Sequence, residues 1–331
     1  MRVTRETLIR IARETAQKRA LSDPGLVAAY LTGSLLTENP FLGGSTDIDI
    51  VLVHAGKTPI PREIVPITPE VHLDIIHNPR SEYDKPKELR IHPWLGPELY
   101  DPLPLYVTQH FFEFVQAGVR AGYDEPVNIL ARARRNAEHA RQVWSGLQVN
   151  HEDGPARLLS YLKSVNHVAN AVALLAGGPL AERRFMLQFQ ERASAAGVPG
   201  LAAGLVGLLG GTHVDKVSLG NLLAAWEGTF LAATVQKETH PSIASPRLTY
   251  YKRSFESLLE TDSPQSILWP LIHTWTLSAA ALPPAQQVSW QAACETFGLT
   301  GEHFKERLEG LDQFLDSVEE VLEKTAASQG L

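Results

Sequence analysis

Two carboxylates stand two residues apart in an otherwise apolar run, residues 47–53, which reads Asp-Ile-Asp-Ile-Val-Leu-Val. Apolar and β-branched residues at this density are typical of a buried strand. Side chains alternate along a strand, so Asp47 and Asp49 share one face while Ile48 and Ile50 point to the other. Like charges held side by side repel each other unless a cation lies between them. The run therefore predicts a strand that carries a metal site.

A third acid, Asp74, stands in the middle of another predicted strand, residues 71–77. A charge buried there needs a partner, and a shared metal site provides one. Where the two strands are neighbours, Asp74 joins Asp47 and Asp49 in one cluster. Ligation by oxygen alone suits Mg²⁺, and three carboxylates can hold two such ions. Paired metal ions stabilise the attacking and leaving oxygens in phosphoryl or nucleotidyl transfer.

A glycine and a hydroxyl residue follow a third predicted strand, residues 26–32. Gly33 allows the backbone to approach a ligand closely, and Ser34 adds a hydroxyl donor. Twelve residues separate Ser34 from Asp47, which begins the acidic strand. With a helix predicted over residues 4–20, these three strands form the skeleton of a small α/β domain.

This order of motifs resembles the DNA polymerase β-like nucleotidyltransferase superfamily: a strand, Gly33-Ser34, a loop, Asp47-Ile48-Asp49, then Asp74 on a later strand. The match covers residues 26–77. The remainder of the chain is similar in general helical character to kanamycin nucleotidyltransferase and related small-molecule enzymes. The resemblance implies an α+β fold, in which a small mixed-sheet catalytic domain precedes an α-helical bundle domain that closes the active-site cleft.

The resemblance also implies roles for individual residues. Asp47 and Asp49 would hold both metal ions, and Asp74 would hold the catalytic one and help to activate the acceptor hydroxyl. Nucleotide-binding positions would be Gly33 and Ser34 on the β- and γ-phosphates, Ser45 as a further phosphate contact, and Lys163 on the triphosphate from the helical domain. For Ser45 a simple turn residue, and for Lys163 a solvated helix face, are the alternatives.

One departure from the family concerns the segment after Gly33-Ser34. Family members often begin a helix there, and its amide groups help to bind phosphate. Here Asn39-Pro40 limits any such helix to one or two turns. Downstream, residues 58–69 contain four prolines, and we expect no long regular element there.

The second part of the chain is predicted to be a helical bundle. Helix-type patterns occupy residues 106–117, 128–147, 155–175, 182–196, 219–237, 249–259, 265–281 and 302–324, with almost no strand-like alternation. Gly118, Gly122 and Pro126 mark the change, and we place the domains at residues 1–120 and 121–331.

Composition limits the partners. With 30 basic and 37 acidic residues the net charge is −7, and a general nucleic-acid binder needs a basic surface. We therefore expect a nucleoside triphosphate and a small-molecule acceptor, with a long nucleic acid and a membrane disfavoured. One cysteine, Cys294, excludes a disulfide framework within the chain and a Cys-based zinc site. No targeting signal is visible, so we expect a cytoplasmic monomer or homodimer that uses Mg²⁺, with Mn²⁺ as an alternative.

Other motifs have weaker functional interpretations. Glu152 and Asp153 are candidate bases, but they lie in a predicted loop. Arg134 and His139 fit the Arg-x4-His spacing of HEPN ribonucleases, although a salt-bridged surface helix explains them as well. Tyr250, Tyr251 and Trp275 are candidates for an acceptor pocket or for core. The last helix has an acidic outer face, interpreted as solvated or as a wall for a cationic acceptor; it comprises Glu306, Glu309, Asp312, Asp316, Glu319, Glu320 and Glu323.

Three hypotheses therefore remain open. The first is a Mg²⁺-dependent nucleotidyltransferase acting on a small acceptor. The second is a catalytically degenerate or regulatory protein of the same fold that acts with a protein partner, as in toxin–antitoxin pairs. The third is a ribonuclease that uses Arg134 and His139.

Overall fold

The chain forms two compact units, residues Met1–Glu125 and Pro126–Leu331. The computed structural model describes residues 4–58, 60–108, 110–149, 153–237 and 239–331. The fold combines a five-stranded mixed sheet with many helices, so the predicted α+β class is confirmed. Each unit is described separately below.

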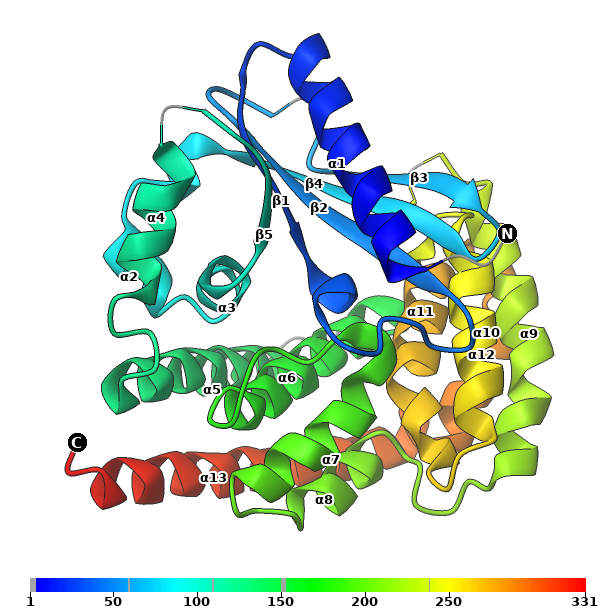
Figure 1. Cartoon of the computed structure of the whole chain (residues 1–331). Coiled ribbons are helices and arrows are strands. Elements are labelled where there is room, and N and C mark those ends of the chain that lie inside the picture. The colour runs from blue at the N-terminus through cyan, green and yellow to red at the C-terminus, as the bar shows by residue number, and fades with distance from the viewer. Residues whose placement is uncertain (1–3, 59, 109, 150–152, 238) are drawn as a thin grey trace. The chain divides into compact units, whose positions relative to one another are not determined.

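The first unit is built on a sheet of order β3-β4-β2-β1-β5, shown in Figure 1. Its strands are β1 (Leu26–Thr32), β2 (Thr46–His54), β3 (Arg62–Thr68), β4 (Val71–Pro79) and β5 (Leu103–Val107). Among the strand pairings of the described residues, only that of β2 with β4 is parallel. The β2–β4 crossover contains the short strand β3, which pairs with the far side of β4.

Helices cover the two faces of this sheet. The helix α1 (Arg5–Ser22) packs Leu8 and Ala12 against Ile48 and Ile50 of β2, while Thr4 caps its first turn. On the other face, Val51 and other residues pack against α2 (Pro86–Arg90), α3 (Leu95–Tyr100) and α4 (Phe111–Arg120). This second core includes the odd-numbered residues of β2 from Val51 onward. The same alternation therefore puts apolar side chains at one end of a strand face and Asp47 and Asp49 at the other.

The proline-rich segment contains the short strand β3, which was not predicted. This strand runs through Pro66 at the edge of the sheet, where a missing backbone donor is tolerated. One expectation for the first unit needs correction, because the segment predicted as one helix over residues 106–117 divides into the end of β5 and the helix α4. The sheet consequently has five strands where three were predicted.

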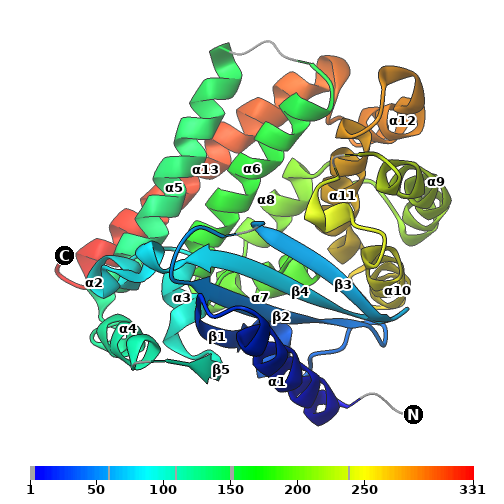
Figure 2. The ribbon, with the colours of Figure 1, turned by 90° about the horizontal axis from the view of Figure 1, so that it is seen from above.

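The second unit is helical throughout the part that the structure describes. Its helices are α5 (Pro126–Val149), α6 (Pro155–Ala173), α7 (Phe185–Ala195), α8 (Leu201–Leu208), α9 (Lys216–Thr234), α10 (Arg247–Leu259), α11 (Leu268–Ala280), α12 (Val288–Thr296) and α13 (Phe304–Ser328). Figures 1 and 2 both show α5 and α6 side by side with α13 next to them. Among the described residues, no helix is long and apolar enough to cross a membrane.

Candidate metal centre

The parallel pairing of β2 with β4 brings the three predicted acids together. Asp49 lies directly opposite Asp74 in the register, and Asp47 lies opposite His72. One carboxylate oxygen from each of Asp47, Asp49 and Asp74 can be chosen so that all three lie within 4.8 Å of one another. These three residues are called the carboxylate triad below. Its geometry fits a divalent cation, because hard cations prefer several carboxylate oxygens.

Burial makes the triad electrostatically unusual. Asp74 is 1% exposed and Asp47 is 6% exposed, while Asp49 is half-buried. Carboxylates removed from water at this separation repel one another strongly, since the surrounding medium screens their charges poorly. The fold therefore concentrates negative charge at one end of the β2–β4 pair, and a bound cation would offset it.

The Gly33-Ser34 segment lies beside the triad. Thr32 is the register partner of Asp49, and the next residue, Gly33, has a φ of 76°. A Cβ placed on Gly33 would come within 1.9 Å of Asp49 Oδ2, so glycine is required both by the backbone and by the space. Ser34 Oγ lies 3.2 Å from Thr46 Oγ1 at the start of β2. The segment continues as a four-residue 3₁₀ turn, Gly33–Leu36, and no long helix follows it.

The two other predicted phosphate contacts lie in different surroundings. Ser45 is fully buried, and its hydroxyl donates to the Leu42 carbonyl at 3.0 Å across the turn formed by Gly43 and Gly44. Lys163 is exposed on α6 in the second unit. Their contact with phosphate remains a prediction.

Arg62 is a member of the site that the sequence did not reveal. Its Nε donates to Asp74 Oδ1 and its Nη2 to Asp74 Oδ2, each at 2.6 Å. Paired hydrogen bonds of this kind between a guanidinium and a carboxylate are among the strongest ion pairs in proteins. The only signal for Arg62 was its place in the proline-rich segment, where an edge strand was not expected.

The secondary candidates are engaged within the second unit. Arg134 pairs with Glu323 at 3.0 Å, and the His139 ring meets the His167 ring edge-on at 4.3 Å between centroids. Burial, together with the neighbouring His139 and Lys163, lowers the pKa of His167 to about 4. Tyr251 and Trp275 are buried among other aromatic side chains, which accords with a place in the core.

The acidic face of the last helix is partly neutralised by α5. Arg141 pairs with three acids of α13, namely Asp312 at 2.5 Å, Asp316 at 2.6 Å and Glu319 at 2.9 Å. Hydrogen bonding to Glu319 raises the pKa of the Arg141 guanidinium. These three acids therefore contribute to the packing of α13 on α5, while their side chains remain 40–69% exposed, as expected for a solvated face.

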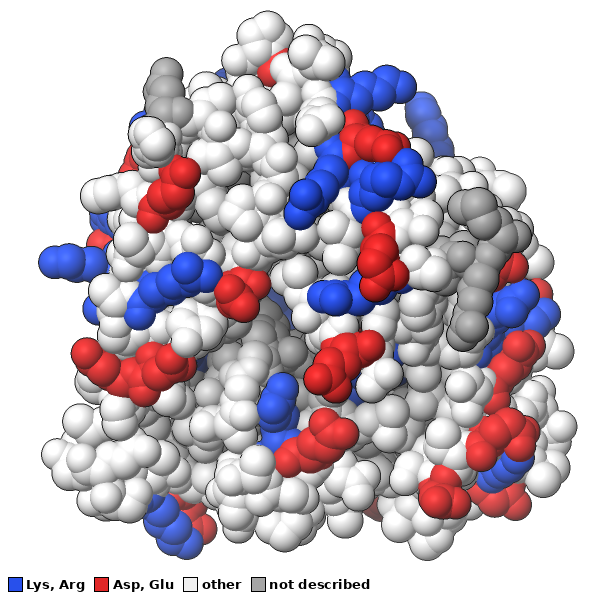
Figure 3. Space-filling view, viewed as in Figure 1, with Lys and Arg blue, Asp and Glu red and all other residues white. Residues whose placement is uncertain are grey.

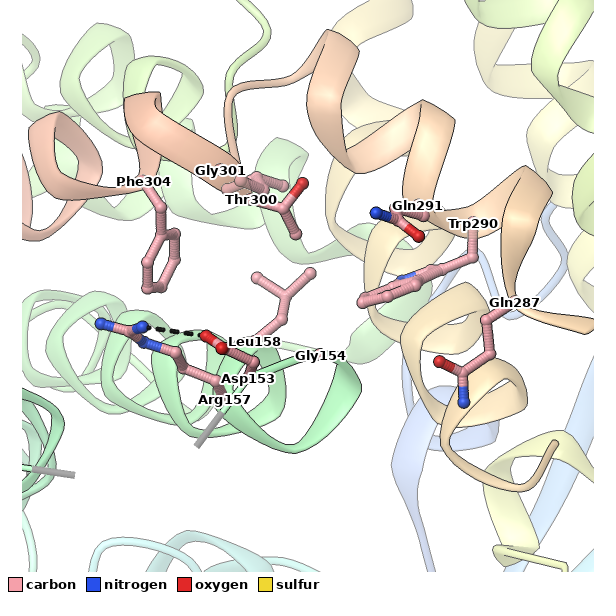
Figure 4. Close-up of a pocket in the computed structure, with 11 residues that line it drawn as sticks. Asp153, Gly154, Arg157, Leu158, Gln287, Trp290, Gln291, Thr300, Gly301 and Phe304 are labelled. Atoms are coloured by element: carbon pink, nitrogen blue, oxygen red, sulfur yellow. Dashed lines mark hydrogen bonds and ion pairs between the residues drawn. The ribbon is translucent and has the colours of Figure 1, made fainter. Parts of the chain in front are cut away.

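A cavity of about 400 Å³ lies within the second unit, between the start of α6, α12 and the start of α13 (Figure 4). Asp153, one of the candidate bases, lines it and pairs with Arg157 at 3.3 Å. The Arg157 guanidinium also lies over the Phe304 ring, 5.0 Å from its centroid. Asp153 thus has a local structural partner, and the other candidate, Glu152, lies outside the described residues.

No family model matches the chain, and no curated protein matches its sequence. A functional assignment for this chain therefore has to rest on the triad and its surroundings.

Proposed function

We propose that the first unit is the catalytic domain of a metal-dependent nucleotidyltransferase. The reaction is the transfer of a nucleoside monophosphate from a nucleoside triphosphate to a hydroxyl group of a small-molecule acceptor. The single observation that carries the proposal is the carboxylate triad, in which Asp49 and Asp74 are register partners. The order of motifs along the chain, with Gly33-Ser34 beside Asp49, adds to it.

The triad's donor set suits the chemistry. Asp47, Asp49 and Asp74 offer only carboxylate oxygens, which would hold one or two Mg²⁺ ions, with Mn²⁺ as a substitute. Bound there, the metal would supply charge stabilisation for the phosphates and lower the pKa of the attacking hydroxyl. The acceptor oxygen attacks the α-phosphorus, and the bond to pyrophosphate breaks. Gly33 and Ser34 would contact the β- and γ-phosphates, Ser34 through its hydroxyl.

The distribution of charge supports a small acceptor. On the face drawn in Figure 3, basic and acidic side chains are interspersed and form no continuous basic stripe. A long nucleic acid needs such a stripe, because neutralising its phosphates provides most of the binding free energy. A nucleoside triphosphate carries its charge in one short segment, which a metal and a few residues can meet.

The alternative function is a regulatory protein of the same fold that acts with a protein partner. The Arg62–Asp74 ion pair favours it, because a cation already occupies both oxygens of one triad member. Under this alternative the triad is a structural remnant, and metal-dependent nucleotide binding is absent.

Calorimetry distinguishes the two functions. Titration of ATP in the presence of Mg²⁺ is expected to give saturable binding to the wild type, lost in Asp47→Asn and Asp49→Asn. Labelled nucleoside triphosphates incubated with pooled acceptors should then release pyrophosphate. A wild-type protein that binds no nucleotide with Mg²⁺ or Mn²⁺ would exclude the enzymatic function and leave the regulatory one.

A further inference from the structure

Arg62 occupies a position from which it controls access to Asp74. The Arg62 side chain is 31% exposed, whereas the Asp74 side chain is 1% exposed, so the guanidinium stands between that carboxylate and the solvent. A metal ion that uses Asp74 must approach this fixed positive charge, and the two cations repel each other at short range. Arg62 and a metal are thus competitors for one carboxylate.

The strand that carries Arg62 allows it to leave. β3 is an edge strand with β4 as its only neighbour in the sheet, and none of its seven residues is fully buried. Arg62 lies opposite Ile76, two positions from Asp74, so it reaches the carboxylate diagonally through a long and flexible side chain. Moving that side chain requires no rearrangement of the core.

We propose that Arg62 is the resident counter-ion of Asp74 and that it exchanges Asp74 for the phosphates of the ligand when metal binds. This proposal rests on the proposed function, because it assumes that the triad binds metal. In the metal-free protein Arg62 offsets part of the triad's charge. With metal and nucleotide bound, the same guanidinium meets the anionic ligand, for which its planar donor geometry is suited.

Metal and nucleotide affinities should respond to Arg62 in opposite directions. Binding of Mn²⁺ alone, followed by the loss of the free-ion electron paramagnetic resonance signal, is expected to be about tenfold tighter in Arg62→Gln than in the wild type. Binding of ATP in saturating Mn²⁺ is expected to be about tenfold weaker. Arg13→Gln, which removes an exposed arginine from α1 of the same unit, is the control for net charge and should change neither affinity.

One outcome would contradict the role of Arg62, and a different one would contradict the metal-dependent function. If the wild type and Arg62→Gln both bind Mn²⁺ with equal affinity, Arg62 is not a competitor and this proposal is wrong. If neither binds Mn²⁺, the metal-dependent function itself fails. Because Arg62→Gln removes an ion pair from the buried Asp74, the variant is expected to be less stable, and Mn²⁺ should raise its melting temperature more than that of the wild type.

A second cluster of charges, at the other end of the same two strands, carries an independent inference. His54 Nδ1 lies 3.0 Å from Asp23 Oδ2, His54 Nε2 lies 2.9 Å from His77 Nδ1, and His77 Nε2 lies 3.0 Å from Glu63 Oε1. Arg19 contacts the same Glu63 oxygen at 2.8 Å. These five residues are called the His54–His77 network. It joins the last turn of α1 to β2, β4 and β3.

The network requires a definite number of protons. Each of its three histidine contacts needs one N–H group. The two contacts to carboxylates need one because a carboxylate only accepts, and the contact between the two imidazoles needs one of the facing nitrogens to donate. Two neutral imidazoles have two N–H groups, one too few. With three N–H groups, one imidazole is positively charged. The positive charges of Arg19 and that imidazole then balance the negative charges of Asp23 and Glu63. Both histidines are 6% exposed, so water cannot readily replace a missing partner.

We infer that the two imidazoles together carry three protons and one positive charge, and that this single shared charge holds α1 against three strands. A fourth proton would place N–H groups on both of the nitrogens that face each other and would break the central contact. Burial lowers the pKa of His77, and the neighbouring His54 lowers it further, while Glu63 acts in the opposite direction. The contacts that hold α1 against the strands are therefore pH-sensitive, and they break on acidification.

Nitrogen-15 spectra of the imidazole side chains test the assignment directly. At pH 7.5 we expect three protonated nitrogens in all across His54 and His77, with the exposed His213 as reference. In Asp23→Asn, which removes one of the two negative charges that balance the shared charge, the pair should hold two protons at the same pH. Two protonated nitrogens in the wild type, or an unchanged spectrum in Asp23→Asn, would each overturn the inference.

Discussion

The two ends of the β2–β4 pair hold two clusters of charged side chains that differ in their balance of positive and negative charge. At the amino ends, the three carboxylates of the triad come close together, and one of them, Asp74, pairs with the Arg62 guanidinium. At the carboxyl ends, the His54–His77 network combines two carboxylates, one guanidinium and one shared imidazolium, and its charges balance. Balanced charges stabilise a fold by themselves, whereas three neighbouring carboxylates repel one another and are stabilised by a bound cation. The comparison therefore predicts a structural role for the second cluster and, under the proposed function, a metal-binding role for the first.

The largest expected effect concerns the carboxylate triad. Asp49→Asn should weaken Mn²⁺ binding by about 100-fold or more and, at the same time, raise the melting temperature by a few degrees, because it relieves repulsion within the triad. Titration of Mn²⁺ and thermal unfolding measure the two effects. Asp84→Asn, at an exposed acid of the same unit, should leave both unchanged. A lower melting temperature in Asp49→Asn would assign the triad a structural role instead.

The balanced cluster should behave in the opposite way. His77→Ala removes the link between His54 and Glu63 and takes a buried hydrogen-bond partner away from each, although Asp23 and Arg19 still contact them. We expect this to lower the free energy of unfolding by about 3 kcal/mol. Urea denaturation measures this change. Mn²⁺ affinity of the folded variant should stay within about twofold of the wild type. If metal affinity falls as steeply as stability, the two ends of the strands are coupled and the distinction between them is lost.

Gly33→Ala tests the geometry of the triad without changing any charge. The new methyl group would overlap Asp49 Oδ2, and the φ of 76° disfavours alanine, so Asp49 must shift. We expect Mn²⁺ affinity to fall about tenfold. Gly56→Ala, where a Cβ meets nothing within 4 Å, is the matched control. Equal affinities in the two variants would mean that the position of Asp49 does not matter for binding.

The smallest effect is the response of the His54–His77 network to pH. The folded pKa of His77 lies below its unfolded value because the residue is buried, so the unfolded chain binds more protons on acidification. Neutral His77 therefore contributes stability above about pH 6.5 that is lost as the pH falls through its folded pKa. Urea denaturation at pH 7.5 and pH 5.5 should show a larger loss for the wild type than for His77→Gln. Equal losses would contradict this linkage.

The triad was predictable from the sequence, and its neighbours were not. Alternation along residues 47–53 fixes the shared face of Asp47 and Asp49, and a neighbouring strand with Asp74 needs only one pairing to complete the cluster. Arg62 escaped prediction because prolines hid an edge strand, whose pairing depends on tertiary contacts rather than on local preference. His54 and His77 gave no pattern at all, since 23 residues separate them and only the strand register brings them into contact.

The parallel pairing of β2 with β4 has a consequence for how this protein can vary. A slip of β4 by one residue against β2 would turn Asp74 to the opposite face and bring Leu73 or Ile75 beside Asp49, so the strands themselves tolerate no insertion or deletion. Residues 56–58, in the crossover, lie outside the strands. We therefore expect lengthening to be tolerated there and excluded within the strands, so that descendants that retain the site should differ in length at residues 56–58 and agree in length along β2 and β4.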